Sequence, residues 1–360
     1  MKVVGLITEY NPLHNGHIHH INEVKRLSKA DILITVMSSS FTMRGDLSLF
    51  DKFTKTIQAL KAGTDIVIEL PLIYAIERAD IFAKNAVLLL NLAGVNEIWI
   101  GSEENDTSIY EKYYLEQNNI NNKDDYSTSY KNKTNIELKS NDILGYSYFK
   151  AIKDYNLNIN LYTIKRINSN YLDQKPNDDL ITSALSIRKN LDLLNKYTPS
   201  FVSSDKDKIL DENKLFSFLK YKILSSDTKY LKEIFFVDEG LENRLHDIKN
   251  YDSYDEFINS LITKRYTKTR IKRMLVYILL DIKKDAVNNI YKDEPNFIRI
   301  LGYSENGQAY LKSIKKNTTI YTNIKNGIND ILDIELKAST VLDSVYNTEI
   351  LKNEMKGPKK

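Results

Sequence analysis

The sequence has no cysteine among its 360 residues. This absence excludes disulfides, thiolate metal sites and a cysteine nucleophile. Long apolar runs are missing too, because the longest, residues 86–93, is far shorter than the ~20 residues that cross a bilayer. The first residues form a strand-like run that soon meets Glu9 and Pro12, which is unlike a secretion signal. We therefore expect a cytoplasmic protein with no membrane span.

The charge shows no excess of one sign. The sequence has 51 basic and 48 acidic residues, which give a formal net charge of +3. Global charge therefore does not indicate a nucleic-acid partner, and any basic surface has to be found locally. A chain of this length buries at least one large core and is expected to divide into two domains.

Short apolar runs alternate with amphipathic ones in the N-terminal part of the chain. The apolar runs are rich in β-branched residues and predict buried strands at residues 3–8, 32–37, 65–71 and 97–101. The runs between them predict helices at residues 18–29, 50–63 and 79–94. This alternation implies βαβ crossovers, and hence an α/β fold with a parallel sheet covered on both faces. Ligands of such folds bind at the carboxyl ends of the strands.

The composition changes twice along the rest of the chain. Residues 105–139 are rich in Asn, Lys, Tyr and Asp, and we interpret them as a polar insertion or linker. The alternation of helix and strand resumes at residues 140–194, whereas strand signals nearly vanish beyond residue 195. We therefore predict an α/β domain over residues 1–197 and a mostly α-helical domain over residues 198–360.

Four of the five histidines lie within residues 14–20, in and just after the stretch EYNPLHNGH. The stretch joins the first predicted strand to the first predicted helix, whose free N–H groups attract phosphate. Gly16 permits a tight turn, and His14 and His17 flank it. We predict that both imidazoles donate hydrogen bonds to phosphate oxygens in a transition state.

Two other interpretations of the histidines stay open. His14 and His17 are also suited to an ordinary polar turn or a helix cap. A zinc site is the other alternative, but His17 and His20 have no acidic third ligand nearby on the same helix face, so we expect no metal site. His19 and His20 are interpreted as belonging to the helix surface and its packing.

Further polar residues are candidates for phosphate contacts. Thr182 and Ser183 precede a predicted helix, where such residues can both cap the helix and bind phosphate, and Arg188 follows within one to two turns. Lys55 and Lys61 are interpreted as solvated helix positions.

The run KRYTKTRIKR, residues 264–273, holds six basic residues and no acidic one. On a helix one side of this region is basic, whereas Ile271, Leu275 and Ile278 face a core. A basic stripe of this kind binds phosphate backbones, and Tyr266 can stack on an unpaired base. A solvated basic helix face is the alternative. The candidate nucleic-acid contacts in the run are Arg265, Lys268, Arg270, Lys272 and Arg273.

Several motifs resemble those of known proteins. NPLHNGH at residues 11–17 and ITSALSIR at residues 181–188 resemble the two signatures of the HxGH nucleotidyltransferase superfamily, whose members bind ATP on a Rossmann-like fold. A longer set of segments resembles the bacterial tRNA(Met) cytidine acetate ligase family over nearly the whole chain. It comprises GLITEYNPLHNGH, SFTMRGDLSLFDKF, ALKAGTDIVIELP, IGSE, SNDILGYSYFKAI, KRYTKTRIKR and RILGYSENG.

The family resemblance implies an ATP-dependent ligase that works in two steps. Acetate attacks the α-phosphate of ATP, which gives acetyl-adenylate and pyrophosphate. The acetyl group then passes to the wobble cytidine of elongator tRNA(Met) and forms N(4)-acetylcytidine. ATP is thus a substrate, expected with Mg²⁺, and no bound organic cofactor is implied.

Carried over residue by residue, the ATP site falls on one stretch and three separate positions. The stretch comprises Ile7, Thr8, Glu9, Tyr10, Asn11, Pro12, Leu13, His14, Asn15, Gly16, His17, Ile18, His19 and His20, in which His14 and His17 are the catalytic pair. The separate positions are Gly101, Asn141 and Arg166. The flanking resemblance also favours Arg44 as a phosphate or tRNA contact over a solvated or ion-paired arginine. MRGDL departs from a more usual glutamine-bearing form, so no role is assigned to Met43.

Two other functions are compatible with parts of the sequence. A small-molecule adenylyl- or cytidylyltransferase of the same superfamily would explain the two short motifs, but it would leave the basic helical domain without a role. A non-catalytic RNA-binding protein would explain the basic run, but the intact His14, Gly16 and His17 argue against it.

Overall fold

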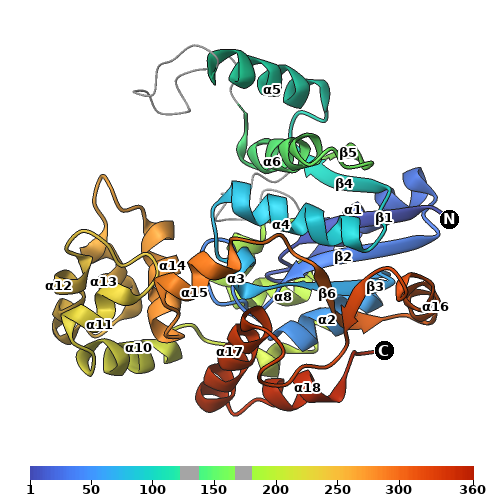
Figure 1. The fold of residues 1–360 in the computed structure, drawn as a ribbon. Coiled ribbons are helices and arrows are strands. Elements are labelled where there is room, and N and C mark those ends of the chain that lie inside the picture. The colour runs from blue at the N-terminus through green and yellow to red at the C-terminus, as the bar shows by residue number, and fades with distance from the viewer. Residues whose placement is uncertain (122–137, 167–180) are drawn as a thin grey trace.

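The computed structural model describes residues 1–121, 138–166 and 181–360. Within them, seven strands form one sheet in the order β5-β4-β1-β2-β3-β6-β7 (Figure 1). The strands are β1 (Val3–Thr8), β2 (Ile32–Ser38), β3 (Ile66–Leu70), β4 (Glu97–Ser102), β5 (Asn160–Lys165), β6 (Phe297–Tyr303) and β7 (Thr319–Tyr321). The predicted α/β fold is confirmed, and the first four predicted strands match β1 to β4 within one residue at each end.

The strands from β5 to β3 run parallel, with β1 between β2 and β4. All seven residues of β2 are buried. Since both faces of this strand are covered, its sequence is a nearly continuous apolar run. The carboxyl ends of the parallel strands meet at one edge of the sheet, and there β1 leads into the EYNPLHNGH turn.

Helices connect the parallel strands (Figure 1). They are α1 (Asn15–Ser28), α2 (Lys52–Lys61), α3 (Leu72–Ala75), α4 (Ala79–Leu92), α5 (Ser108–Asn121) and α6 (Ser140–Asp154). Three short helices follow β5, namely α7 (Ala184–Lys189), α8 (Leu194–Tyr197) and α9 (Ser200–Ser203). The predicted polar insertion is helical in part, because α5 packs on α6 with the rings of Tyr113 and Tyr146 4.6 Å apart. Its continuation, residues 122–137, lies outside the described residues.

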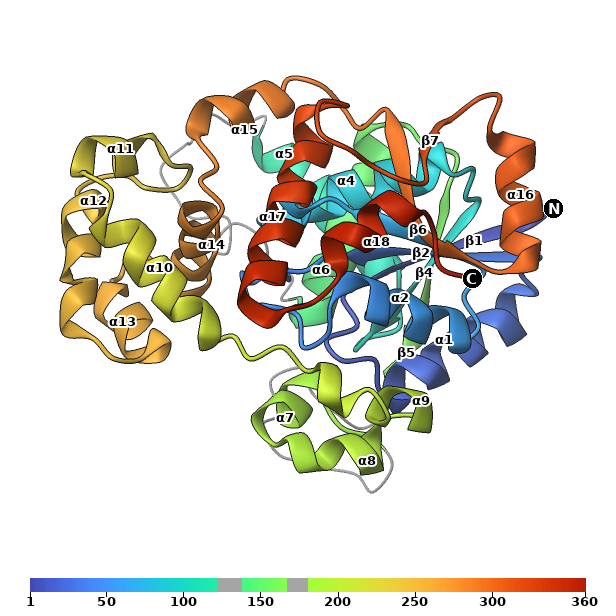
Figure 2. The same cartoon turned by 90° about the horizontal axis from the view of Figure 1, so that it is seen from below.

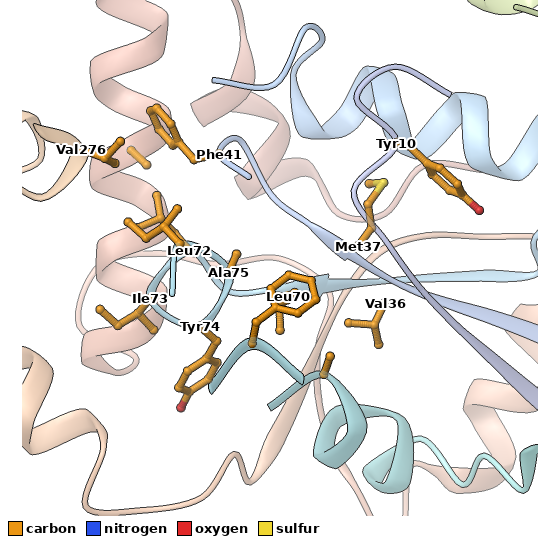
Figure 3. Close-up of a cluster of buried hydrophobic side chains, with 14 of the residues drawn as sticks. Tyr10, Val36, Met37, Phe41, Leu70, Leu72, Ile73, Tyr74, Ala75 and Val276 are labelled. Carbon is orange, nitrogen blue, oxygen red and sulfur yellow. The ribbon is translucent and has the colours of Figure 1, made fainter. Parts of the chain in front are cut away.

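A group of short helices at residues 214–279, here called the helical module, stands at one end of the α/β body (Figures 1 and 2). It comprises α10 (Lys214–Leu224), α11 (Thr228–Glu233), α12 (Leu241–Arg244), α13 (Tyr254–Leu261) and α14 (Lys268–Leu279). As predicted, Ile271, Leu275 and Ile278 of α14 are buried. Figure 3 shows Val276 of the same helix beside Phe41 of the α/β body, so apolar packing joins the module to the sheet domain.

Residues 198–360, predicted to form a mostly α-helical domain, also contribute two strands to the sheet. After α15 (Lys284–Ile290) the chain returns to the sheet, where β6 pairs antiparallel with β3 and β7 pairs with β6. Helices α16 (Glu305–Ile314), α17 (Asp330–Tyr346) and α18 (Ile350–Lys356) then pack on the α/β body (Figure 2). The strand was missed because Arg299 interrupts the apolar run of β6, although its side chain is fully buried against Glu354.

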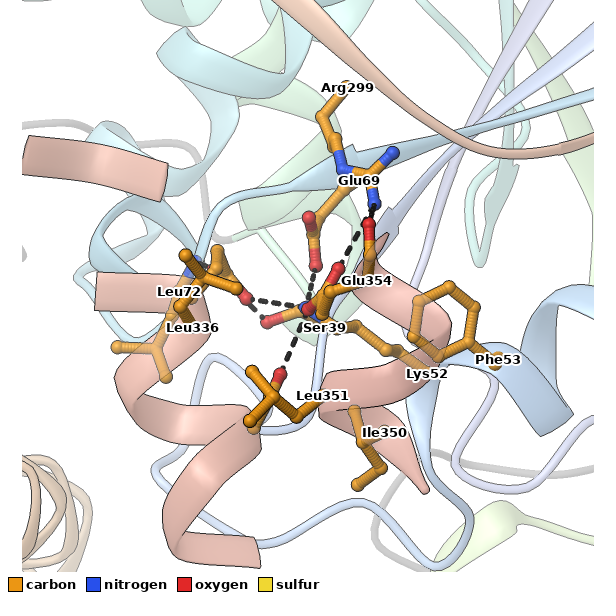
Figure 4. Close-up of polar contacts among 12 residues, drawn as sticks. Ser39, Lys52, Phe53, Glu69, Leu72, Arg299, Leu336, Ile350, Leu351 and Glu354 are labelled. Carbon is orange, nitrogen blue, oxygen red and sulfur yellow. Dashed lines mark hydrogen bonds and ion pairs between the residues drawn. The ribbon is translucent and has the colours of Figure 1, made fainter. Parts of the chain in front are cut away.

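A buried network of ion pairs fastens the C-terminal helices to the sheet (Figure 4). The Nζ atom of Lys52 in α2 lies 2.6 Å from Glu69 of β3 and 2.9 Å from Glu335 of α17. It also pairs with Glu354 of α18, which in turn lies 3.0 Å from Arg299 of β6. All five side chains are fully buried. The network therefore joins segments that are far apart in the sequence.

Candidate active site

His14 and His17 hold the start of α1 in place. His14 is the N-cap of the helix, and its Nδ1 atom accepts a hydrogen bond from the Gly16 N–H at 3.1 Å. The Nδ1 atom of His17 accepts a reciprocal bond from the His14 N–H at 3.2 Å. This is a capping box in which histidines replace the usual residues. Capping, which the sequence left open as an alternative, therefore uses the Nδ1 atom of each ring.

The capping bonds also fix the tautomer of both rings. Because Nδ1 accepts a bond in each neutral imidazole, the ring proton must lie on Nε2. The rings of His14 and His17 lie together, with centroids 3.8 Å apart. Each Nε2–H is thus left as a donor for a ligand, and capping and phosphate binding use opposite sides of the same rings.

Both histidines are neutral at physiological pH. Burial, together with the charges of Arg166 and Arg188, lowers the pKa of His14 to about 3. Burial, His14 and Arg166 lower the pKa of His17 well below its ordinary value. Burial likewise lowers the pKa of His20 to about 4. Positive charge for an anionic ligand therefore comes from the arginines, and the imidazoles contribute hydrogen bonds.

This environment predicts a specific dependence of stability on pH. Between the ordinary histidine pKa of 6.5 and about 3, the unfolded chain binds a proton that folded His14 does not bind, so stability falls as the pH drops below 6.5. Urea unfolding of wild type and of a His14→Asn variant, which keeps an N-cap acceptor, should show this. The free energy of unfolding should fall between about pH 7.5 and about pH 5 in both proteins. We expect this fall to be about 2 kcal/mol smaller in the variant than in wild type. An identical pH dependence would mean that folded His14 takes up the proton.

Gly16 is required by the ring that caps the helix. A Cβ atom at this position would lie 2.9 Å from Cε1 of His14 and 3.3 Å from Ile181. Tyr10, on the other side of the turn, places its ring 5.0 Å from that of His17. The turn thus packs closely around both imidazoles.

The structure brings the two predicted arginines to the same edge. The Nη1 atom of Arg188 donates to the carbonyl oxygen of Asn11 at 2.6 Å. This bond connects α7 to residues 10–17, here called the histidine turn. Arg166 directly follows β5, and its charge acts on His14 and His17. Gly101 lies beside it, since a Cβ atom there would be 3.4 Å from Cγ of Arg166.

The other predicted positions line the same edge of the sheet. Ser183 caps α7 by accepting the Ser186 N–H at 3.1 Å, as its sequence context predicts. Asn141, in the first turn of α6, donates from Nδ2 to Glu103 just beyond β4. The hydroxyls of Thr8, Ser38 and Thr182 are buried and have no hydrogen-bond partner among the described residues. Buried hydroxyls of this kind fit a polar ligand.

Lys55 corrects one interpretation of the sequence. It is fully buried rather than solvated. Its Nζ atom donates to the carbonyl oxygens of Glu9 at 3.1 Å and Ser38 at 2.8 Å, and it contacts Ser48 Oγ at 3.1 Å. Burial lowers its pKa to about 7. The residue braces the ends of β1 and β2, and no local pattern distinguishes it from a solvated lysine.

Residues 38–49, here called the β2 loop, lie between the turn and the helical module. The Met43 N–H donates to Oε1 of Glu9 at 2.6 Å, and the Leu49 N–H donates to Oδ1 of Asn11 at 2.8 Å. On its other side the loop touches α14, because a Cβ atom on Gly45 would lie 2.6 Å from the backbone nitrogen of Arg273. Arg44 is thereby held, half-buried, where the two parts of the protein meet.

Two of the predicted nucleic-acid contacts serve this junction instead. Lys272 pairs with Asp46 at 2.7 Å and with Glu212 at 3.2 Å. The Nε atom of Arg273 donates to the Met43 carbonyl oxygen at 2.7 Å. Both side chains are largely buried, so they hold the β2 loop and do not form an exposed stripe.

Three further basic residues of the run are paired with acids. Arg265 pairs with Glu239, Lys268 with Asp255 at 3.2 Å, and Arg270 with Asp238 at 3.5 Å. The acids come from other segments of the helical module, so they could not be seen in the run itself. Tyr266 is buried and donates from its hydroxyl to Glu239 at 2.9 Å, which does not fit the predicted role in base stacking.

The whole chain is similar to known proteins. A family model described as HIGH Nucleotidyl Transferase matches residues 1–357. A tRNA(Met) cytidine acetate ligase from Leuconostoc citreum is 38% identical over 89% of this chain and 86% of its own length. Another from a Geobacillus species is 36% identical over 99% of both chains. The chain belongs to the tRNA(Met) cytidine acetate ligase family.

Solved structures from this family have the same fold. The apo crystal structure of Thermotoga maritima TmcAL covers 100% of this chain with a TM-score of 0.85 and 26% identity. A second crystal form of that protein, bound with alpha-thio ATP, has a TM-score of 0.83. The resemblance that the motifs predicted is confirmed. Within the described part of this chain, no helix combines the length and apolarity needed to cross a bilayer.

Proposed function

We propose that the chain is an ATP-dependent acetate ligase of tRNA(Met). It activates acetate as acetyl-adenylate with release of pyrophosphate, and transfers the acetyl group to the wobble cytidine of elongator tRNA(Met), which forms N(4)-acetylcytidine and AMP. The likeness to named tRNA(Met) cytidine acetate ligases over nearly the full length of both chains carries this proposal. The relative bound with alpha-thio ATP supports ATP as substrate. We also propose that the enzyme acts in the cytoplasm.

The site residues have distinct roles in the first step. Attack of an acetate oxygen on the α-phosphate adds negative charge to the phosphate oxygens, which the Nε2–H donors of His14 and His17 stabilise. Arg188 and Arg166 supply the positive charge, because the imidazoles are neutral. Gly101 and Asn141, at the end of β4 and the start of α6, hold the nucleoside end of ATP, and Thr182 and Ser183 contact the phosphates.

Mg²⁺ is expected to bind together with ATP, coordinated by its phosphates. The described residues contain no group of three or more His, Asp or Glu side chains that could hold a metal ion. We therefore assign no protein ligand to Mg²⁺, and no step above depends on one.

The exposed basic residues of the helical module are proposed to contact the tRNA backbone. Each of Arg265, Lys268 and Arg270 has an acidic partner, but exposed ion pairs contribute only about 0–1 kcal/mol, so phosphates can compete for them. A triple Ala variant should bind tRNA about tenfold more weakly and with a shallower salt dependence, since fewer counterions are released. Filter binding at several salt concentrations measures both quantities.

The matched control for this variant removes the same charge elsewhere. Lys312, Lys315 and Lys316 are exposed and lie on or just after α16, away from the helical module (Figure 1). Their triple Ala variant should leave the salt slope unchanged. An equal slope for wild type and the Arg265/Lys268/Arg270 variant would remove these residues from the tRNA interface.

The proposed function is tested by following labelled acetate. The protein is incubated with ATP, labelled acetate and unmodified elongator tRNA(Met), and nucleosides are analysed after digestion. N(4)-acetylcytidine is the expected product, and a tRNA(Met) transcript with uridine at the wobble position should remain unlabelled. Lack of acetylcytidine would refute the proposal. ATP turnover that requires a phosphorylated metabolite would instead favour a small-molecule nucleotidyltransferase.

A further inference from the structure

Glu9 lies between the histidine turn and the β2 loop. It directly follows β1 and precedes the turn that carries His14. Its Oε1 atom accepts the Met43 N–H at 2.6 Å, whereas its other carboxyl oxygen accepts no hydrogen bond from the described residues. The side chain is half-buried. One oxygen is thus fixed to the backbone, and the other keeps its lone pairs.

The helical module reaches Glu9 through a short series of contacts. Arg273 donates to the carbonyl oxygen of Met43, and Met43 donates from its N–H to Glu9. Lys272 fixes the same loop through Asp46. Glu9 therefore lies where the residues of the ATP site meet the loop that the helical module holds.

The second step of the proposed reaction needs a base. The exocyclic N4 amine of cytidine attacks the acetyl carbon, a C–N bond forms, and the C–O bond to AMP breaks with its electron pair on the phosphate oxygen. One proton of the amine must then leave. His14 and His17 cannot accept it, because their Nδ1 atoms hold backbone N–H groups and their Nε2 atoms carry protons.

Two other described carboxylates near this edge are already engaged. Asp46 pairs with Lys272, and Asp142 accepts bonds from the hydroxyls of Ser102 and Tyr110. Glu103 accepts a bond from Asn141 but has a second, buried oxygen with no partner among the described residues. Glu103 is therefore the rival of Glu9 that an experiment has to test.

We propose that Glu9 is the general base that takes the proton from the cytidine N4 amine as the acetyl group is transferred. This inference rests on the proposed function and assigns Glu9 a role in the second step that is separate from ATP binding. Proton transfer of this kind typically contributes about 10²–10⁴-fold to the rate.

The surroundings of Glu9 make it a stronger base than a solvated carboxylate. Burial raises its pKa and outweighs the opposing effects of the Met43 N–H, Lys55 and Arg188, while Asp46 raises it further. The other titratable groups that interact with Glu9 are Tyr148 of α6 and Arg273 of α14. Since a base must be unprotonated to act, the rate of acetyl transfer should fall as the pH drops through this raised pKa.

Glu9→Gln separates the base from a structural role, because the amide oxygen can still accept the Met43 N–H. Enzyme preloaded with ATP and labelled acetate is mixed rapidly with tRNA(Met), and acetyl transfer is followed in a single turnover at several pH values. We expect transfer to slow by about 10²-fold in Glu9→Gln and to lose the inflection with pH. Acetate-dependent exchange of pyrophosphate into ATP should fall less than transfer does. Glu9→Asp, which keeps a carboxylate, should retain the inflection.

The outcomes distinguish this inference from the proposed function. Near-normal transfer by Glu9→Gln, or loss of the inflection in Glu103→Gln instead, would overturn the role of Glu9 alone. If the wild-type enzyme forms no acetylated tRNA(Met), both proposals fail.

Discussion

Replacing His14 by Asn or His17 by Gln is expected to slow acetyl-adenylate formation by about 10²–10³-fold, the usual effect of removing one donor that stabilises a developing charge. The substitutions are chosen from the geometry of the turn. Asn is a good N-cap residue, and Gln at the third helical position keeps the reciprocal bond of a capping box. Each variant thus retains the backbone turn and loses the imidazole Nε2–H.

Acetate-dependent exchange of labelled pyrophosphate into ATP measures this step without tRNA. His246→Asn is the matched control, since His246 is the histidine outside residues 14–20 and belongs to the helical module. It should exchange pyrophosphate at the wild-type rate. Circular dichroism and the urea midpoint check that the folds are equal. Exchange at nearly the wild-type rate in both turn variants would show that the imidazoles do not stabilise the α-phosphate.

The sequence carried enough information to predict the parallel sheet and the histidine turn. Residues 3–8 and 32–37 are strands that other elements cover on both faces of the sheet. Their sequences are therefore apolar almost throughout, and this pattern predicts buried strands. The turn is equally local, because His14, Gly16 and His17 contact one another within four residues. The lowered pKa of each ring could not be predicted, since it depends on burial by the folded chain and on Arg166, which is distant in the sequence.

Charged residues account for most of what the sequence did not reveal. Lys55 and Arg299 are of residue types that usually lie at the surface. They can be buried here because partners from other segments of the chain bind their charged groups. The basic run is the converse case. The run is basic, but the side chains of Lys272 and Arg273 bind the β2 loop and do not face solvent. A charge pattern records how many charges a segment has, and the tertiary structure decides which of them face solvent.

Lys52→Met is expected to lower the free energy of unfolding by about 3–5 kcal/mol, because it removes one partner from a buried ion network. Met keeps much of the volume of the lysine stem, so the loss comes mainly from charge. Burial alone would lower the pKa of Lys52, but Glu335, Glu354 and Glu69 raise it above its ordinary value. Without this ammonium, the carboxylates are left with Arg299 as the cation of the network. Urea unfolding followed by circular dichroism measures the change.

Glu69→Gln is the control that tests how the charges are distributed. Burial and the neighbouring Glu335 raise the pKa of Glu69 well above its ordinary value, so the folded protein disfavours a charge on this carboxyl and its amide analogue should cost about 1 kcal/mol or less. Lys52 and Arg299 instead lower the pKa of Glu354, so Glu354→Gln should be much more destabilising. Equal losses in the two variants would contradict this difference between Glu69 and Glu354. Glu69 of the sheet is thus the carboxyl on which a charge is disfavoured, whereas Glu354 of α18 pairs with both cations, Lys52 and Arg299, and so holds this helix on the sheet.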